Sequence, residues 1–135
     1  MKTISTLLNV LFLFVVSNSF CQKLNAPELG FEYACVSDGY NSFQATFSYD
    51  EKPFKADNIF YVELSNQFGS FNNPIVLSEI KDQNFSFEFH STFSLPNSVA
   101  GEGYKIRVRS TNPQVVSESS AMFDAYVINH QELIL

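Results

Sequence analysis

The strongest constraint on the fold is a strict alternation of apolar and cationic residues between positions 104 and 109. The apolar set is Tyr104, Ile106 and Val108, and the cationic set is Lys105, Arg107 and Arg109. A period of two places these sets on opposite faces of an extended strand. The β-branched residues in the segment, and the Thr-Asn-Pro sequence that follows it, disfavour a helix. The sequence therefore predicts a half-buried β-strand here.

Six other segments alternate in a similar way or form short apolar runs between turn signals. They are residues 31–36, 42–49, 60–64, 75–80, 85–90 and, least regularly, 121–128. Helical periodicity never persists beyond a turn or two, so we predict an all-β, antiparallel β-sandwich of about seven strands. Tyr104 opens its strand behind a Leu-Pro turn, which is typical of the tyrosine corner of immunoglobulin-like and fibronectin-III-like sandwiches.

The alternation also predicts strand pairing and burial. The fifteen phenylalanines, many of them two residues apart, favour a core filled by aromatic rings. Cys35 lies on the apolar face of the first strand and is expected to be a small buried hydrophobe. Ser37-Asp38-Gly39 is a turn signal, so the first two strands are expected to form a hairpin. The side chains expected on the apolar faces of the first and fifth strands are Phe31, Tyr33, Cys35, Phe85, Phe87 and Phe89.

The first 21 residues are predicted to be a secretory signal peptide. Lys2 precedes a ten-residue apolar run, 7–16, which is too short to span a bilayer as a helix. Cleavage after Cys21 leaves Gln22 first; cleavage after Ser19 is the alternative, and the bulky Phe20 disfavours a lipid anchor on Cys21. Residues 22–135 are then one sandwich domain, or the N-terminal fragment of a longer protein. We expect a secreted or cell-surface protein that is not inserted in the membrane after signal removal.

The sequence contains few residue patterns that indicate catalysis, metal binding or nucleic-acid binding. A net charge of −6 disfavours binding to nucleic acid. His90, His130 and the one retained cysteine are too scattered for a zinc site or a nucleophile–base pair. We therefore predict no cofactor, no metal, no catalytic residues and no enzymatic activity. The alternative for Asp50, Glu51 and Asp57 is that their carboxylates bind calcium, but a solvated loop is the favoured interpretation.

Two sets of residues are candidates for a binding surface. The cationic row of Lys105, Arg107 and Arg109 suits an acidic glycan or partner, although pairing with Glu63 or Glu88 on neighbouring strands is the favoured interpretation. The second set consists of loop aromatics that could stack on sugars or contact a neighbouring domain, namely Tyr40, Phe54 and Phe68.

Several segments resemble the N-terminal sandwich module of Bacteroidetes surface proteins. These proteins are exported through the type IX secretion system and commonly end in a gliding-motility-associated C-terminal domain. The resemblance covers roughly residues 31–128, and its most specific part pairs ELS-x-x-x-GSF at 63–71 with AGEGYKIRVRST at 100–111. Family members are usually much longer than this chain.

The resemblance implies a non-catalytic structural or adhesive unit of a cell-surface protein, linked to gliding motility or surface adhesion. Its partners would be neighbouring domains, other surface proteins or polysaccharide. The alternative from a different class is a small secreted or periplasmic carbohydrate-binding module.

Overall fold

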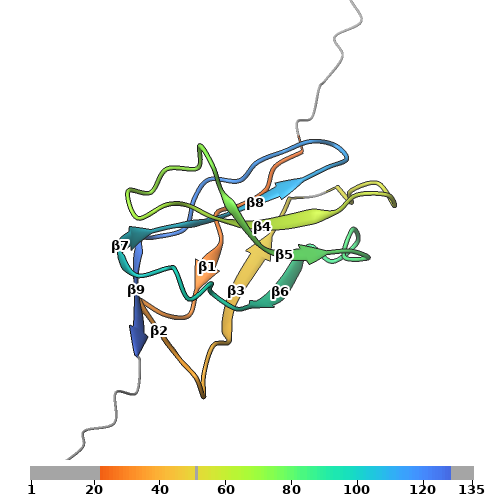
Figure 1. The fold of residues 1–135 in the computed structure, drawn as a ribbon. Coiled ribbons are helices and arrows are strands. Elements are labelled where there is room, and N and C mark those ends of the chain that lie inside the picture. The colour runs from red at the N-terminus through yellow and green to blue at the C-terminus, as the bar shows by residue number, and fades with distance from the viewer. Residues whose placement is uncertain (1–21, 51, 129–135) are drawn as a thin grey trace, which may run out of the picture.

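The computed structural model describes residues 22–50 and 52–128, and this part of the chain contains strands but no helix. The predicted signal peptide lies outside the described residues. The fold is the all-β sandwich that the sequence predicts (Figure 1). Its nine strands are β1 (Glu28–Leu29), β2 (Tyr33–Ser37), β3 (Phe43–Ser48), β4 (Phe60–Leu64), β5 (Ile75–Ile80), β6 (Glu88–Phe93), β7 (Gly101–Tyr104), β8 (Ile106–Ser110) and β9 (Phe123–Ile128).

The strands form two layers with immunoglobulin/fibronectin-III-like connectivity. One layer has the order β1-β3-β6. The other combines the sets β2-β9-β7 and β5-β4-β8, because only Lys105 separates β7 from β8. The named strand pairs are antiparallel except β2 with β9, which run parallel. The chain crosses from the first layer to the second between β1 and β2, so β2 becomes an edge strand.

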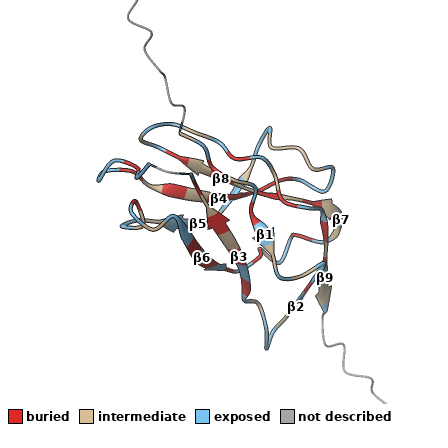
Figure 2. Cartoon of the chain, turned by 180° about the vertical axis from the view of Figure 1, so that it is seen from behind, coloured by how far each residue is buried: buried red, intermediate tan, exposed pale blue. Residues whose placement is uncertain are grey.

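Aromatic rings fill the space between the layers, as the phenylalanine content predicts. Strands of both layers carry buried residues (Figure 2). Phe47, Phe60 and Phe123 are each at most 1% exposed. The ring of Phe60 lies 4.8 Å from that of Phe54 and 5.2 Å from that of Phe89, between centroids. Aromatic pairs at such separations add stability beyond the area that they bury.

The expected burial of the first strand is wrong, and so is the expected hairpin. Ala34 and Val36 of β2 are buried, whereas Tyr33 is 61% exposed and Cys35 is exposed. β2 pairs with β9 rather than with β3. The rings of Phe31, Phe43 and Phe123 already crowd this end of the core, with Phe31 lying 5.2 and 5.3 Å from the other two. The bulky Tyr33 ring therefore faces out, and Ala34 and Val36 face inward.

The fifth strand is shifted relative to its prediction. β6 runs from Glu88 to Phe93 with Phe89 and Phe93 buried, while Phe85 and Phe87 are 72% and 45% exposed. Asn84 explains the shift, because its carbonyl accepts a hydrogen bond from the Phe54 amide at 3.0 Å and its side chain accepts one from Asn58 at 2.9 Å. The segment before β6 is thereby held as a loop, and two of its phenylalanines remain outside the core.

Candidate functional site

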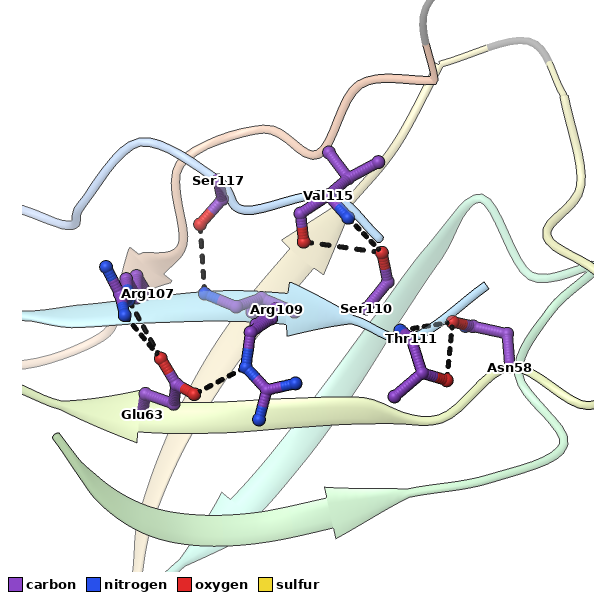
Figure 3. Close-up of polar contacts among 9 residues, drawn as sticks. Asn58, Glu63, Arg107, Arg109, Ser110, Thr111, Val115 and Ser117 are labelled. Atoms are coloured by element: carbon purple, nitrogen blue, oxygen red, sulfur yellow. Dashed lines mark hydrogen bonds and ion pairs between the residues drawn. The ribbon is translucent and has the colours of Figure 1, made fainter. Parts of the chain in front are cut away.

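Two of the three cations in the row, Arg107 and Arg109, are bound to a buried carboxylate and do not form an open binding surface. Glu63 on β4 has a side chain that is 3% exposed, and it receives Nε and Nη2 of Arg107 and Nε of Arg109, each at 2.8 Å (Figure 3). The two guanidinium groups also lie over the rings of Phe71 and Tyr61, at 4.4 and 4.6 Å from the centroids. This arrangement agrees with the interpretation that favours cross-strand pairing. Lys105 makes no ion pair within 22–50 and 52–128.

The three candidate loop aromatics do not form a common surface. Phe54 is 2% exposed and packs 4.9 Å from the ring of Tyr49, so its assignment to a binding surface is wrong. Phe68 is 83% exposed beside a small cavity of about 280 Å³. Tyr40 is 57% exposed and lines a different and larger groove. The charged loop that follows β3 gave no sign of burial at Phe54, because the ring is buried against Tyr49 and Phe60, which flank the loop and meet only in the folded sandwich.

Tyr104 has the geometry of a tyrosine corner. Its hydroxyl donates to the carbonyl oxygen of Ala100 at 3.3 Å, and the residue is 7% exposed. The bond ties the start of the β7–β8 segment to the turn before it. Tyr104 is therefore placed as a structural residue.

One candidate site is an open groove between β2 and β3, with a volume of about 640 Å³. Tyr33 and Cys35 contribute from β2, and Tyr40 lies in the connection between the two strands. The rings of Phe31 and Phe43 also line the groove. Polar side chains on the β3 side are Gln44, Thr46 and Thr92. Cavities of several hundred Å³ that combine apolar walls with a few polar groups are typical of binding sites.

The backbone of β2 faces this groove with unused hydrogen-bonding groups. The Asp124 amide donates to the Glu32 carbonyl at 3.1 Å, which indicates that even-numbered residues of this segment bond to β9 in the parallel ladder. Alternate residues of such a ladder direct both main-chain groups to the partner. Ala34 and Val36 therefore bond to β9, whereas the N–H and C=O groups of Tyr33 and Cys35 point to the opposite side. Within the described residues, no other strand pairs with that side.

The opposite wall of the groove has a similar gap. The Tyr49 amide donates to the Phe87 carbonyl at 2.9 Å, so odd-numbered residues of β3 bond to β6 and even-numbered ones face β1. The pairing with β1 ends at Leu29 opposite Ala45. Gln44 thus lies beyond the end of β1, and its main-chain groups face the groove.

Other strand edges in the described part of the chain are better protected. The outer edge of β8 is covered by residues 115–120, where the hydroxyls of Ser117 and Ser120 accept the amides of Val108 and Ile106, each at 2.9 Å. Edge strand β5 carries Glu79, which pairs with Lys81 at 2.7 Å. Natural edge strands are usually shielded by charges, bulges or covering segments. β2, with the sequence YACVS, has no charged residue and no register shift.

The described residues contain no group of three or more His, Cys, Asp or Glu side chains that could hold a metal ion. Of the three carboxylates in the calcium alternative, Asp57 accepts two hydrogen bonds from the Asn112 amide group at 2.7 and 2.9 Å, and Asp50 accepts one from Asn25 at 3.2 Å. The third, Glu51, lies outside the described residues.

Within residues 22–50 and 52–128, no helix is long and apolar enough to span a membrane.

Comparisons with known proteins identify no family for the chain. No protein-family profile matches the sequence, and no curated protein matches it significantly. Among solved structures, the fold is similar to a superoxide reductase (neelaredoxin) from Ignicoccus hospitalis, with 15% identity, a TM-score of 0.43, and coverage of 79% of this chain and 83% of that chain. Two variants of the same enzyme match with TM-scores of 0.45 and the same identity.

These neighbours correct the functional expectation from the sequence. They are named as enzymes, and none of the three is named as an adhesion or secretion protein. The expected non-catalytic adhesive unit of gliding motility, its carbohydrate-binding alternative and the expected absence of enzymatic activity are therefore withdrawn. At this identity and TM-score the likeness gives no argument for superoxide chemistry in this chain. A functional proposal has to come from the groove itself.

Proposed function

We propose that this protein is a binding module that accepts an extended polypeptide segment as an additional β-strand along β2. The observation that carries the proposal is the outer edge of β2, where the main-chain groups of Tyr33 and Cys35 face an open groove of about 640 Å³. An extended peptide is the ligand whose own alternating N–H and C=O groups complement such an edge. In this mode the main chain supplies affinity, and pockets for alternate side chains supply specificity.

The groove is suited to receive the side chains that an added strand would direct inward. Successive side chains of a strand point to opposite faces of the sheet. Those on the same face as Ala34 and Val36 would lie against the rings of Phe31 and Phe43, which are 5.2 Å apart. Thr46 and Thr92 also line the groove, where the Thr46 hydroxyl is hydrogen-bonded to Nδ1 of His90 at 3.0 Å. An apolar side chain that approaches from the edge is therefore accommodated without disturbing the core.

We further propose that binding takes place outside the cytoplasm. The support is the sequence of residues 1–21, with its basic start and short apolar run. The resemblance to exported Bacteroidetes surface modules supports the same location.

The test is amide hydrogen exchange of the protein with and without a short capped peptide of alternating threonine and valine. The amides of Tyr33 and Cys35 are expected to exchange rapidly in the free protein and to become protected with the peptide. Those of Ala34 and Val36, which face β9, provide a control within the same strand, because they are expected to be protected in both states. A capped peptide of the same length made only of proline has no amide donors for a ladder and should protect none of them.

A variant provides an independent check. Cys35→Pro removes an amide that no described residue uses and leaves the bonds to β9 in place, so the fold is expected to persist while peptide binding is lost. Protection that appears elsewhere on the protein, or peptide binding that Cys35→Pro leaves unchanged, would refute the proposal.

A further inference from the structure

We infer that the strand accepted by this groove alternates basic side chains with apolar ones. This inference rests on the proposed function and specifies the chemical class of the partner. It is carried by the distribution of charge around β2 and by the exposed tyrosine rings on the outer face of the same sheet.

The part of the chain that surrounds the groove is acidic without compensating cations. Between Leu24 and Asp50 the sequence contains Glu28, Glu32 and Asp38 but no lysine or arginine. Glu28, Glu32 and Asp38 are exposed. The neighbouring strands β9 and β7 add Asp124 and Glu102, again without a cation within either strand.

None of the lysines and arginines in the described part of the chain lies within residues 24–50 or in strands β7 and β9. Arg107 and Arg109 are bound to Glu63, and Lys81 pairs with Glu79. Lys105 lies at the junction of β7 and β8, where its side chain is next to Gly69. No ion pair of the described residues involves the acidic groups around β2. Their charge is therefore available to a cationic partner.

The outer face of the sheet combines these acids with aromatic rings. Tyr33 lies opposite Asp124 in the β2–β9 register, and Cys35 lies opposite Tyr126. Tyr33 and Tyr126 are 61% and 42% exposed. Asp124 is two residues before Tyr126 on β9, and Glu102 follows Gly101, which lies opposite Ala125. Loss of hydration raises the pKa of Tyr126, and Asp124 and then Glu102 raise it further. Exposed tyrosine rings beside carboxylates are suited to ammonium or guanidinium groups through cation–π contacts.

The geometry of an added strand directs its two sets of side chains to these two environments. Neighbouring strands lie about 4.8 Å apart, so side chains on the outer face of the added strand are adjacent to Tyr33 and Cys35. Long lysine or arginine side chains there reach across β2 toward Asp124. The alternate side chains turn inward to Phe31 and Phe43 and are expected to be apolar. The partner is therefore a segment with a basic–apolar repeat of two residues.

The experiment compares three capped peptides of equal length in which valine alternates with lysine, threonine or glutamate. Binding is followed by fluorescence anisotropy at low and at physiological salt, and the bound site is located by amide hydrogen exchange. At low salt the lysine peptide is expected to bind about tenfold more tightly than the threonine peptide, as two or three exposed charge pairs would provide. The glutamate peptide is expected to bind most weakly, and the differences should shrink as salt screens the charges.

Asp124→Asn keeps an oxygen that can accept the Gly103 amide, which donates to the present carboxylate at 3.4 Å. The variant is expected to bind the lysine peptide several-fold more weakly and to bind the threonine peptide with unchanged affinity. Glu79→Gln on the distant strand β5 is the matched control and should leave the affinity of both peptides unchanged.

The outcomes separate the two proposals. If the lysine and threonine peptides protect Tyr33 and Cys35 with equal affinity, the basic preference is wrong while the proposed function stands. If no peptide protects these amides, the proposed function fails and the inference fails with it. Tight binding of the lysine peptide that neither Asp124→Asn nor Cys35→Pro reduces would indicate unspecific attraction to an acidic protein and would overturn the inference.

Discussion

Replacing Glu63 tests the polar network that joins β4 to β8. Glu63→Gln keeps the size of the side chain but removes the charge that two arginines share at 2.8 Å. Hydrogen bonds to charged groups contribute about 1.5–3 kcal/mol each, and removing one partner of a buried ion pair typically costs about 3–5 kcal/mol.

The arginine side chains set the expected magnitude. They are 24% and 28% exposed, whereas that of Glu63 is 3% exposed, so water can partly solvate the guanidinium groups after the substitution. The glutamine oxygen also retains one acceptor. We therefore expect a loss of about 2–3 kcal/mol in the free energy of unfolding, at or just below the lower limit of the range for buried pairs. For a domain of this size the melting temperature should fall by roughly 10 °C.

Urea denaturation followed by circular dichroism measures this loss. The matched control is Glu79→Gln, because Glu79 forms an ion pair of similar length with Lys81 at the exposed surface. Exposed pairs contribute little, so this control should not change the denaturation midpoint measurably. If Glu63→Gln were no more destabilising than Glu79→Gln, the network would not stabilise the sheet as argued here.

Three further predictions address the core and the tyrosines. Tyr104→Phe removes the donor to Ala100 and is expected to lower the free energy of unfolding by about 1 kcal/mol; an unchanged urea midpoint would contradict the structural role of the corner. Phe54→Ala is expected to cost about 3–5 kcal/mol because the ring is buried, whereas Phe68→Ala should stay within about 0.5 kcal/mol; equal losses in the same denaturation assay would show that the two rings are not differently placed. Burial raises the pKa of Tyr49 above its ordinary value of 10.0, and loss of hydration raises that of Tyr126. The native state thus retains these protons longer than the unfolded chain does, so the associated stability is present below about pH 10 and is lost as pH rises through the native pKa values. An ultraviolet titration in which every tyrosine ionised together near the ordinary value would refute this.

The sequence alone predicted those strands whose pattern had one consistent solution. Residues 60–64 and 75–80 coincide with β4 and β5, and the alternation at 104–109 identified the buried face of β8. The sequence left Glu63 and Glu88 as candidate partners of the cations, and the structure pairs Arg107 and Arg109 with Glu63. At 104–109 one face carries large apolar side chains and the other carries the cations. A shift of one residue would bury the arginines, so only one register is compatible with a dry core.

The tertiary structure decided the segments in which both registers were possible. On β2, Tyr33 and Cys35 alternate with Ala34 and Val36, and neither set is charged. Which of these faces is buried depended on the space left by Phe31, Phe43 and Phe123. The buried face of β6 was predicted correctly at Phe89, but the bonds that hold Asn84 in a loop decided where the strand begins. The candidate groove depends on the same choice of face in β2. This strand exposes its tyrosine and its unpaired edge because it pairs with β9 and not with β3. Local alternation records which residues share a face, but the partner strand and the volume available in the core determine which face is buried.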